Sequence, residues 1–393
     1  MRVLLIHERY RYRGGEDAAV AAEAALLAGA GVEVATLYED NRRIEGSGSA
    51  ALALRAIWSS QGRRMAMAAI DRERPDIVHV HNTFPLLSPS VYGAARARGI
   101  PVVQTLHNYR LLCPNGLLLR DGRPCELCVG RIVKWPAVAH ACYRDSRAAS
   151  AAVAAVTGVH HLVGTWRSAV DRFLALTPFA ARLFIAGGLP PERLEICPPA
   201  VPDPGPDAAG NASRSGALFV GRLSPEKGIE TLLSAWSGMP YPLDVIGEGP
   251  LEDGLRRHAP PNVRFLGHLP PAAVSAAMSQ AALLLFPSLC HENFPLVVAE
   301  ASAHGLPSLA SAGGAVQDMI ADGVTGVLAP PGDVEAWHRL ARELLERPDR
   351  LRRIGLAART AFVEQHGSGR AVARRLAIYG GLLARGPGTR DPG

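Results

Sequence analysis

The chain has 393 residues, of which 48% are hydrophobic and 20% are charged, and its formal net charge is +6. This is ordinary globular composition, and the length exceeds what one hydrophobic core usually serves, so we expect two domains of about 150–200 residues. No apolar run approaches the ~18 residues that span a bilayer, and the opening MRVLLIHERY is too short for a signal sequence, so a membrane-spanning protein is excluded and a cytoplasmic one is expected.

Short apolar strands alternate with helical stretches through the first half of the chain. The expected buried parallel strands cover residues 3–7, 32–38, 76–81 and 101–107, and Ala-rich segments with helical periodicity, such as 17–29, lie between them. This alternation predicts a doubly wound α/β domain. Gly14 and Gly15 follow the first strand, where glycine lets a ligand approach the backbone, although a plain strand-to-helix turn explains the pair equally well.

Four of the six cysteines fall in one segment with the spacing C-x11-C-x2-C-x13-C: Cys113, Cys125, Cys128 and Cys142. The C-x-x-C pair with two outer thiols is compatible with a tetrahedral zinc site, and in a reducing compartment a metal is favoured over disulfides. Buried unligated thiols are the simpler alternative, and an iron–sulfur cluster is a less supported one.

The middle of the chain is locally basic. Residues 123–182 contain eight Lys or Arg residues against three acids. A solvated basic face accounts for this, and attraction to an anionic membrane surface or a phosphorylated lipid is the sharper hypothesis. Binding to nucleic acid is disfavoured because no interleaved aromatic residues or known motif accompany the charge.

A second α/β pattern begins after a linker. Residues 201–216 are rich in Pro, Gly, Asn and Ser, which is typical of a linker. The strand pattern then restarts at residues 217–223, 243–249, 263–267, 282–288, 306–311 and 326–331. The second half is therefore predicted to be another Rossmann-like domain, and two such domains with a cleft between them suit a large ligand.

The stretch VGRLSPEKGI, residues 220–229, indicates an anion site. A strand is expected to end at Gly221, and Ser224 followed by Pro225 is typical of a helix start. Arg222 and Lys227 flank that start, so two cations would join the free amides and the dipole of the helix. The stretch is not a Walker A sequence, and no G-x-G-x-x-G follows the first strand, which disfavours a nicotinamide dehydrogenase.

Two glutamates bracket an apolar run in HENFPLVVAE, residues 291–300. Glu292 is expected on the loop after the strand at 282–288, at the edge where open α/β sheets bind ligands. A helix is expected to begin near Pro295, which puts Glu300 about a turn and a half inside it. Two carboxylates so placed suit hydroxyl-bearing parts of one ligand, because a carboxylate accepts two hydrogen bonds from a vicinal diol.

Together these motifs resemble the retaining glycosyltransferases of family GT4, which have the GT-B fold. The resemblance covers nearly the whole chain and rests on the N-terminal G-G, on G-R-L-x-x-x-K-G and on E-x7-E. It implies that Glu292 faces the donor sugar, that Glu300 binds the ribose, and that Arg222 and Lys227 neutralise the diphosphate. It further implies donor contacts from Gly14, Gly15, Gly221, Asn293, Phe294, Pro295 and Leu296. A histidine at the place of His107 contacts the donor sugar in that family.

The sequence therefore predicts a GT-B enzyme that transfers a hexose-type sugar from a nucleotide diphosphate-sugar, with retention, to a glycan, lipid-linked or small-molecule acceptor. Residues 1–200 would bind the acceptor, residues 217–365 would bind the donor, and residues 366–393 would form a C-terminal helix and tail on the first domain. No D-x-D occurs, so no metal is expected in catalysis. The alternatives are a catalytically silent nucleotide-sugar-binding protein, a glycosyl phosphorylase, for which no pyridoxal lysine motif is evident, and a basic nucleic-acid-binding protein.

Overall fold

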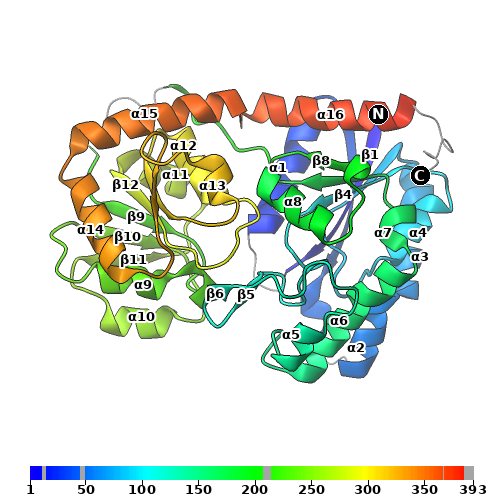
Figure 1. The fold of residues 1–393 in the computed structure, drawn as a ribbon. Helices are drawn as coiled ribbons and strands as arrows, with labels where there is room; N and C mark the ends of the chain where they lie inside the picture. The colour runs from blue at the N-terminus through cyan, green and yellow to red at the C-terminus, as the bar shows by residue number, and fades with distance from the viewer. Residues whose placement is uncertain (11–14, 45–48, 207–213, 366, 385–393) are drawn as a thin grey trace. The chain divides into compact units, whose positions relative to one another are not determined.

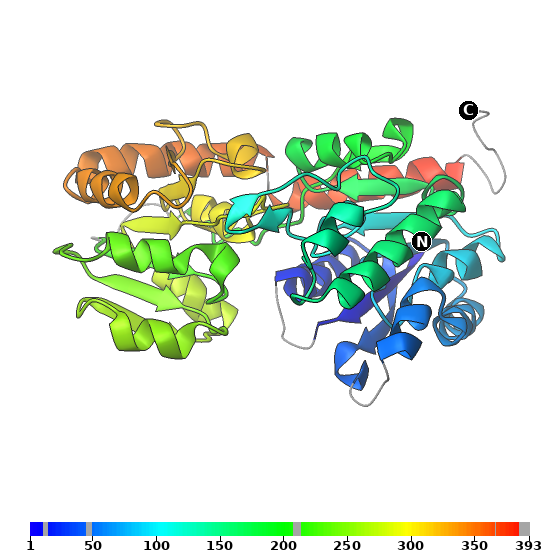
Figure 2. The same ribbon diagram turned by 60° about the horizontal axis from the view of Figure 1, so that its bottom comes forward.

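The computed structural model describes residues 1–393 except 11–14, 45–48, 207–213, 366 and 385–393. The chain divides into two compact units. Unit 1 comprises Met1–Leu118, Glu126–Ala200 and Gly369–Gly393, and unit 2 comprises Leu119–Cys125 and Val201–Ser368. Each unit is built on its own six-stranded sheet with helices on both faces (Figures 1 and 2).

The sheet of unit 1 is entirely parallel, in the order β2-β1-β3-β4-β7-β8. Its strands are β1 (Arg2–Arg9), β2 (Glu33–Asp40), β3 (Ile77–Val80), β4 (Val102–Leu106), β7 (Arg172–Ala175) and β8 (Leu194–Ile196). The helices of this unit are α1 (Gly15–Gly29), α2 (Ser49–Ile57), α3 (Ser60–Glu73), α4 (Ser90–Arg96), α5 (Trp135–Ala139), α6 (Arg147–Leu162), α7 (Thr165–Ser168), α8 (Pro178–Ala186) and α16 (Ser368–Ala384).

Alternate residues of the unit 1 strands enter two separate cores. Leu4 and Ile6 of β1 pack with residues of α3, α4 and α8 on one face of the sheet. Val3 and Leu5 pack on the other face with Leu27 of α1 and with residues of α16. This period of two is the pattern of strands buried on both faces, and it explains why their sequences read as continuous apolar runs.

The sheet of unit 2 repeats the design, in the order β11-β10-β9-β12-β13-β14, again all parallel. Its strands are β9 (Ala217–Val220), β10 (Leu243–Ile246), β11 (Val263–Gly267), β12 (Leu283–Phe286), β13 (Ser308–Ser311) and β14 (Val327–Ala329). The helices are α9 (Ile229–Ala235), α10 (Glu252–His258), α11 (Pro271–Gln280), α12 (Leu296–Ala303), α13 (Val316–Met319), α14 (Val334–Leu345) and α15 (Pro348–Gln365). A short hairpin, β5 (Leu119–Arg120) with β6 (Arg123–Pro124), also belongs to this unit.

The predicted α/β class with two parallel sheets is confirmed, and every strand expected from the sequence is present. Two strands of unit 1, β7 and β8, had not been expected. The middle of the expected linker, residues 207–213, lies outside the described residues. No helix within the described ranges is long and apolar enough to cross a membrane.

Two helix starts differ from the expectation. Helix α1 begins at Gly15, so this glycine belongs to the first helical turn rather than to a preceding loop. After Ser224 the chain forms only a short 3-10 turn, Pro225–Lys227, and α9 begins at Ile229 after Gly228. The Ser224 hydroxyl does not cap this turn, because it bonds instead to the Glu226 carboxylate at 2.6 Å. Pro225 and Lys227 therefore precede the helix that was expected to contain them.

Candidate active site

The loops that follow β9, β10 and β12 meet at the carboxyl edge of the unit 2 sheet. Gly247 has φ +136°, and a Cβ there would lie 1.9 Å from the Gly221 carbonyl oxygen. Gly228 has φ +66°, and a Cβ there would lie 2.0 Å from the Pro287 carbonyl oxygen. Only glycine fits at either position, because a side chain would be both strained and in collision with backbone. These close crossings fix the loop with Lys227 against the loop that follows β12.

Lys227 and Glu292 form an ion pair at this edge. The Lys227 Nζ donates to Glu292 Oε1 at 2.7 Å, and the Ser288 hydroxyl donates to the same oxygen, also at 2.7 Å. Burial lowers the pKa of Lys227, but the attraction and hydrogen bond to Glu292, together with Cys290 and Glu226, outweigh burial and raise that pKa above its ordinary value. Lys227 is therefore a cation held beside a carboxylate, on loops that follow two neighbouring strands of the sheet.

Arg222 and Glu300 are ionisable side chains without a side-chain partner in the part of the chain that the structure describes. Arg222 follows β9 and is exposed, and the described part of the chain offers its side chain no hydrogen-bond or ion-pair partner. Glu300 lies on α12, and burial alone raises the pKa of its carboxyl to about 7. No side-chain partner of Glu300 is found among the described residues. Charged groups that lack protein partners at the ligand-binding edge of a sheet are typical of a binding site.

The loop after β13 packs against the start of the segment from His291 to Leu296. A Cβ on Gly314, whose φ is +57°, would lie 3.1 Å from His291 Cα and 3.3 Å from the Glu292 nitrogen. The Ala315 amide donates to the Glu292 carbonyl oxygen at 3.4 Å. Side chains of Phe294 and Leu296 pack in a small apolar cluster, so their backbone and not their side chains is left to meet a ligand.

In unit 1, one face of the sheet changes from apolar to polar toward the carboxyl ends of its central strands. On β3, His79 is followed two residues later by His81, which lies just after the strand. On β4, Thr105 is followed in the same way by His107. The His107 Nε2 and the His81 Nδ1 share a hydrogen bond at 2.9 Å. Burial lowers the pKa of both imidazoles, and the neighbouring His79 lowers that of His81 further. Both rings are therefore neutral near pH 7, so one donates to the other.

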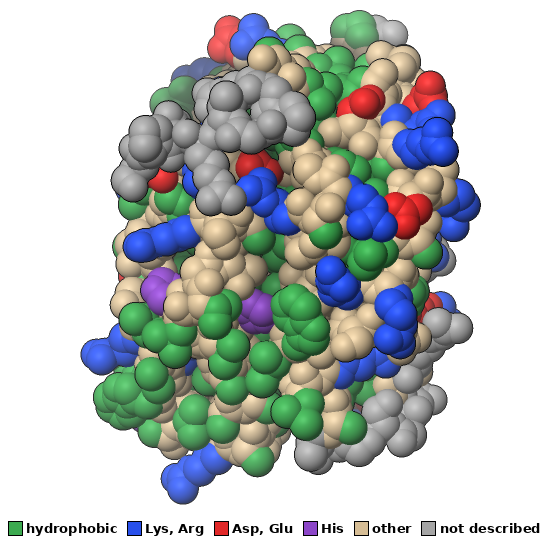
Figure 3. Space-filling view, turned by 90° about the vertical axis from the view of Figure 1, so that its right-hand side faces the viewer, with side chains coloured by type: hydrophobic (Ala, Val, Ile, Leu, Met, Phe, Trp, Pro, Cys, Tyr) green, Lys and Arg blue, Asp and Glu red, His purple; other side chains and the backbone are tan. Residues whose placement is uncertain are grey.

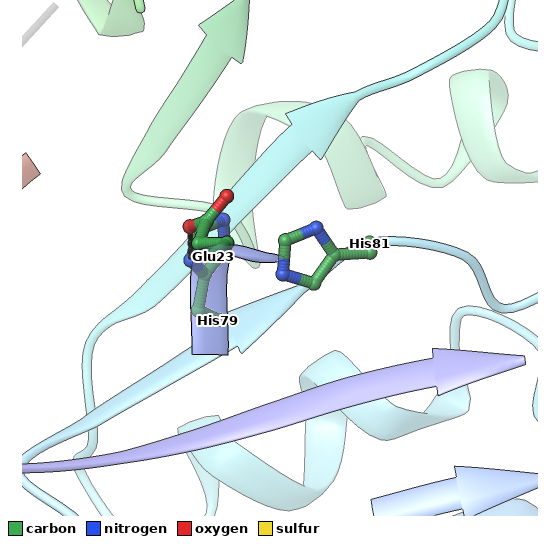
Figure 4. Close-up of side chains that lie close together, drawn as sticks. All are labelled: Glu23, His79 and His81. Carbon is green, nitrogen blue, oxygen red and sulfur yellow. Dashed lines mark ion pairs between the residues drawn. The ribbon is translucent and has the colours of Figure 1, made fainter. Parts of the chain in front are cut away.

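Glu23 of α1 joins His79 and His81 in a buried cluster (Figure 4). Potential ligand atoms of these three residues all lie within 4.8 Å of one another, which a metal ion would require. However, the Arg375 Nε of α16 lies 2.9 Å from a Glu23 oxygen, and the His79 nitrogens bond to the hydroxyls of Tyr379 at 2.6 Å and Thr105 at 2.7 Å. A cation beside Arg375 would be repelled, so the cluster is a buried hydrogen-bonded network rather than a metal site.

The start of α1 adds carboxylates at the same edge of unit 1. Asp17 Oδ1 lies 2.8 Å from the His7 Nε2 at the end of β1. Glu16 Oε2 accepts from the Tyr10 hydroxyl at 2.9 Å and from the Asn108 amide at 3.3 Å. Gly14, one of the predicted donor-binding residues, lies outside the described residues.

Two family models cover most of the chain. "Glycosyltransferase Family 4" matches residues 14–203, and "Glycosyl transferases group 1" matches residues 211–361. The chain belongs to glycosyltransferase family 4.

Curated relatives agree with the family 4 assignment. Similarity extends to the D-inositol 3-phosphate glycosyltransferase of Segniliparus rotundus, at 32% identity over 49% of this chain and 49% of that protein. It extends also to the glycogen synthase of Mycobacterium tuberculosis (strain CDC 1551 / Oshkosh), at 27% identity over 84% of this chain and 74% of that protein. The matched region of the first of these relatives thus spans only about half of its length, 49%.

The fold is that of solved GT-B structures. Anabaena HepE, solved in complex with UDP and glucose, matches with a TM-score of 0.68 at 15% identity, covering 97% of this chain and 100% of that one. The sucrose-phosphate synthase of Thermosynechococcus elongatus matches with a TM-score of 0.68 at 19% identity, covering 98% and 99%. The predicted GT-B fold class is confirmed.

Family 4 motifs of the second domain converge in unit 2, as the Lys227–Glu292 contact shows. In unit 1, His107 lies at the carboxyl edge of the sheet, bonded to His81. Sequence reasoning missed Ser288 and the Gly313–Gly314 pair. The Gly-Gly pair directly after an apolar strand was the available signal, and for Ser288 there was none.

The four cysteines of the predicted zinc site are free thiols. Burial, with smaller contributions from the neighbouring thiols of Cys113 and Cys142, raises the pKa of Cys128 to about 11. Cys125 belongs to unit 2 and the other three to unit 1. Within the described residues the only group of three or more metal-ligand types at ligand distance is the Glu23 cluster, so the three thiols of unit 1 do not all lie at ligand distance from one another. The zinc site stays a prediction.

Glu300 makes the free energy of unfolding depend on pH. Its pKa is raised from 4.5 to about 7 in the folded chain, so the folded state holds the proton more tightly than the unfolded state. The cost of burying this carboxylate is absent below about pH 4.5, grows as pH rises to about 7, and is complete above that. We expect Glu300→Gln to stabilise the ligand-free protein by about 1–3 kcal/mol at pH 8 and by little at pH 4.5.

Denaturant unfolding at both pH values measures this effect. Glu364→Gln is the matched control, because Glu364 is an exposed residue near the end of α15. Equal effects of the two substitutions at pH 8 would contradict the burial of an uncompensated charge at Glu300.

Proposed function

We propose that the protein transfers a hexose-type sugar from a nucleotide diphosphate-sugar, with retention of the anomeric configuration, to a glycan, lipid-linked or small-molecule acceptor. The donor binds at the carboxyl edge of the unit 2 sheet, and the acceptor binds to unit 1. The observation that carries this proposal is the charge arrangement of unit 2. Lys227 is paired with Glu292, whereas Arg222 and the partly buried Glu300 have no side-chain partner among the described residues.

Each charge suits one part of such a donor. Arg222 and Lys227 provide two cations for a diphosphate, which is the role of a divalent ion in metal-dependent transferases. Glu300 accepts the two hydroxyl groups of the ribose, and this supplies the hydrogen bonds that its carboxylate lacks in the free protein. Glu292 lies beside Lys227, and in this proposal it faces the anomeric carbon of the sugar. The HepE structures in complex with UDP and with UDP-glucose make the uridine nucleotides the first donors to test.

The proposed reaction takes place on one face of the sugar. The bond between the anomeric carbon and the phosphate oxygen breaks, and its electron pair leaves with the nucleoside diphosphate. The acceptor hydroxyl oxygen forms a bond to the same carbon from the same side and gives its proton to a phosphate oxygen. Arg222 and Lys227 stabilise the growing negative charge on the diphosphate, and Glu292 stabilises the positive charge at the anomeric carbon. No protein nucleophile is needed in this scheme.

A catalytically silent nucleotide-sugar-binding protein is the second candidate. The unit 2 site by itself would support this second function. Binding needs the two cations and Glu300, but it does not need Glu292 to be aligned with the anomeric carbon. Purified protein incubated with a nucleotide-sugar separates the two hypotheses. A transferase hydrolyses its donor slowly in the absence of acceptor, whereas a silent binding protein leaves the donor intact.

The melting temperature in the presence of UDP-, GDP- and ADP-sugars tests the proposed donor class. A ligand that binds only the folded state stabilises it by about 2.7 kcal/mol at 100 times its dissociation constant. We expect one base to raise the melting temperature clearly and the other two to raise it less. If no nucleotide-sugar at millimolar concentration changes the melting temperature, the proposed donor class is wrong.

The proposal includes peripheral contact with the cytoplasmic face of an anionic membrane. The excess of Lys and Arg over acids in residues 123–182 supports it.

A further inference from the structure

The outward side of α6 in unit 1 carries no charge beyond its first residue. The helix buries Val153, Val156 and His160, among others, against the unit. The residues that it exposes after Arg147 are all apolar: Ala148, Ala151, Ala155, Val159 and Leu162. Their spacing of three and four residues forms one continuous stripe. A surface helix normally presents polar residues to water, so this second apolar side indicates a surface that something covers.

Neighbouring segments extend the stripe with large exposed side chains. Helix α6 packs against both α2 and α5. The His160 Nε2 lies 2.7 Å from the Ile57 carbonyl oxygen, which holds the end of α2 and the following Trp58 beside the end of α6. A Cβ on Gly158 would lie 3.4 Å from the Ile132 carbonyl oxygen, so the segment before α5 also runs along α6.

The side chains that these segments expose are aromatic or branched. The exposed fractions are 52% for Trp58, 68% for Val133, 57% for Trp135, 71% for Leu162 and 66% for Val163. We call these five residues, together with the α6 stripe, the α6 face. Figure 3 shows apolar side chains gathered at the lower end of one side of the molecule, with Lys and Arg around them.

Positive charge surrounds the α6 face. Within residues 126–168, the exposed cations are Arg131, Arg144, Arg147 and Arg167, and the only acids are Glu126 and Asp145. None of these four arginines forms an ion pair with any described residue. The Arg131 guanidinium lies 5.8 Å from the centre of the Trp135 ring, so a cation and an interfacial aromatic residue are presented together.

We propose that the α6 face docks onto a bilayer that contains anionic phospholipid. Tryptophan concentrates at the level of lipid headgroups, because its ring is apolar and its N–H is polar. Leu, Val and Ala side chains of an interfacial helix enter the acyl boundary, and each arginine near an anionic surface adds electrostatic attraction. A second copy of the chain fits less well, because a two-fold contact through this face would bring its unpaired arginines together.

This inference deepens the proposed function and rests on it for its purpose, since a docked unit 1 would meet an acceptor carried by a lipid. The docking itself is independent of sugar transfer. It needs only the apolar stripe, the two tryptophans and the arginines, all of which lie in one unit.

Flotation with vesicles tests the proposal. The full chain is mixed with vesicles of phosphatidylcholine containing about 30% phosphatidylglycerol, or of phosphatidylcholine alone, at about 0.1 M and 0.5 M salt. We expect binding to the anionic vesicles, a blue shift of tryptophan fluorescence, and weaker binding at high salt. Val133→Glu combined with Leu162→Glu should reduce binding by about tenfold or more, because two apolar contacts become two repelled charges.

The matched control is Val324→Glu combined with Leu356→Glu in unit 2, where the exposed fractions are 58% and 51%. It should bind vesicles as the wild type does. If the α6-face variant is unstable, Arg131→Glu with Arg167→Glu replaces it and should reduce binding to anionic vesicles in the same way. Equal losses in control and test variants, or equal binding to neutral vesicles, would overturn the proposal. So would a concentration-dependent dimer that Leu162→Glu dissociates, because the face would then be covered by a second copy.

Donor hydrolysis in solution keeps the two proposals distinguishable. The α6-face variants should hydrolyse the donor at the wild-type rate without vesicles. If the wild-type protein binds vesicles but does not hydrolyse the donor, the transferase proposal is contradicted and the docking proposal is not.

Discussion

Replacing Glu292 with Gln is expected to reduce kcat by about 100-fold or more. The substitution keeps the shape of the side chain but removes the negative charge that we propose faces the anomeric carbon, where positive charge develops in the transition state. Glu292→Ala should be about equally slow. The measurement is the steady-state rate of sugar transfer, or of donor hydrolysis where no acceptor is known, at saturating donor.

Comparing Glu292→Gln with Glu292→Ala separates a loss of catalysis from a loss of stability, because Glu292 also pairs with Lys227. Glu292→Gln keeps an oxygen near the Lys227 ammonium and the Ser288 hydroxyl, which lie 2.7 Å from Oε1 in the wild type. Glu292→Ala leaves both donors without this acceptor, so its melting temperature should be the lower of the two. A charge-stabilising role would be contradicted if the Glu292→Gln variant had nearly the wild-type rate and only the less stable Glu292→Ala variant were slow. Glu292 would then be only a structural partner of Lys227.

Lys227→Ala and Arg222→Ala are each expected to lower turnover by about tenfold or more. Each removes one preorganised cation from the leaving diphosphate, an effect of about 2–4 kcal/mol for a single donor. Arg222 is exposed and has no partner among the described residues, so its loss should leave the melting temperature unchanged. Lys227→Ala should also lower the melting temperature, because it leaves Glu292 half-buried without its cation.

Arg342→Ala is the matched control for these cations. Arg342 is an exposed residue of α14 that pairs with Glu346 at 2.8 Å, and its loss should change neither rate nor nucleotide binding. Wild-type turnover in a folded Arg222→Ala/Lys227→Ala double variant would show that the diphosphate binds elsewhere.

Strands that are buried on both faces could be predicted from their apolar runs. Residues 3–7 and 282–288 carry enough consecutive apolar side chains to be recognised without any knowledge of their neighbours. Strands β7 and β8 could not be recognised so easily, because β7 begins with Arg172 and β8 contains Glu195, which leaves neither with a long apolar run. The late start of α9 also escaped prediction, because the Ser224 hydroxyl bonds to Glu226 instead of capping the turn.

The residues of the unit 2 site were predictable, but their contacts were not. Lys227 and Glu292 are 65 residues apart in the chain, and only the pairing of β9 with β12 brings their loops together. The burial of Glu300 likewise depends on how α12 packs and not on its own sequence. Single histidines such as His81 carry no periodic signal, so the polar edge of unit 1 becomes visible only through the register of β3 and β4.

Calorimetric titration of the free nucleoside diphosphate into the wild type, Glu292→Gln and Glu300→Gln tests the assignment of the donor site most directly. The ligand has a ribose and a diphosphate but no sugar to transfer. We therefore expect Glu292→Gln to bind it with nearly the wild-type dissociation constant, and Glu300→Gln to bind it about tenfold more weakly, a loss of ~1.4 kcal/mol. Lost binding in Glu292→Gln together with unchanged binding in Glu300→Gln would contradict the assignment of the two glutamates.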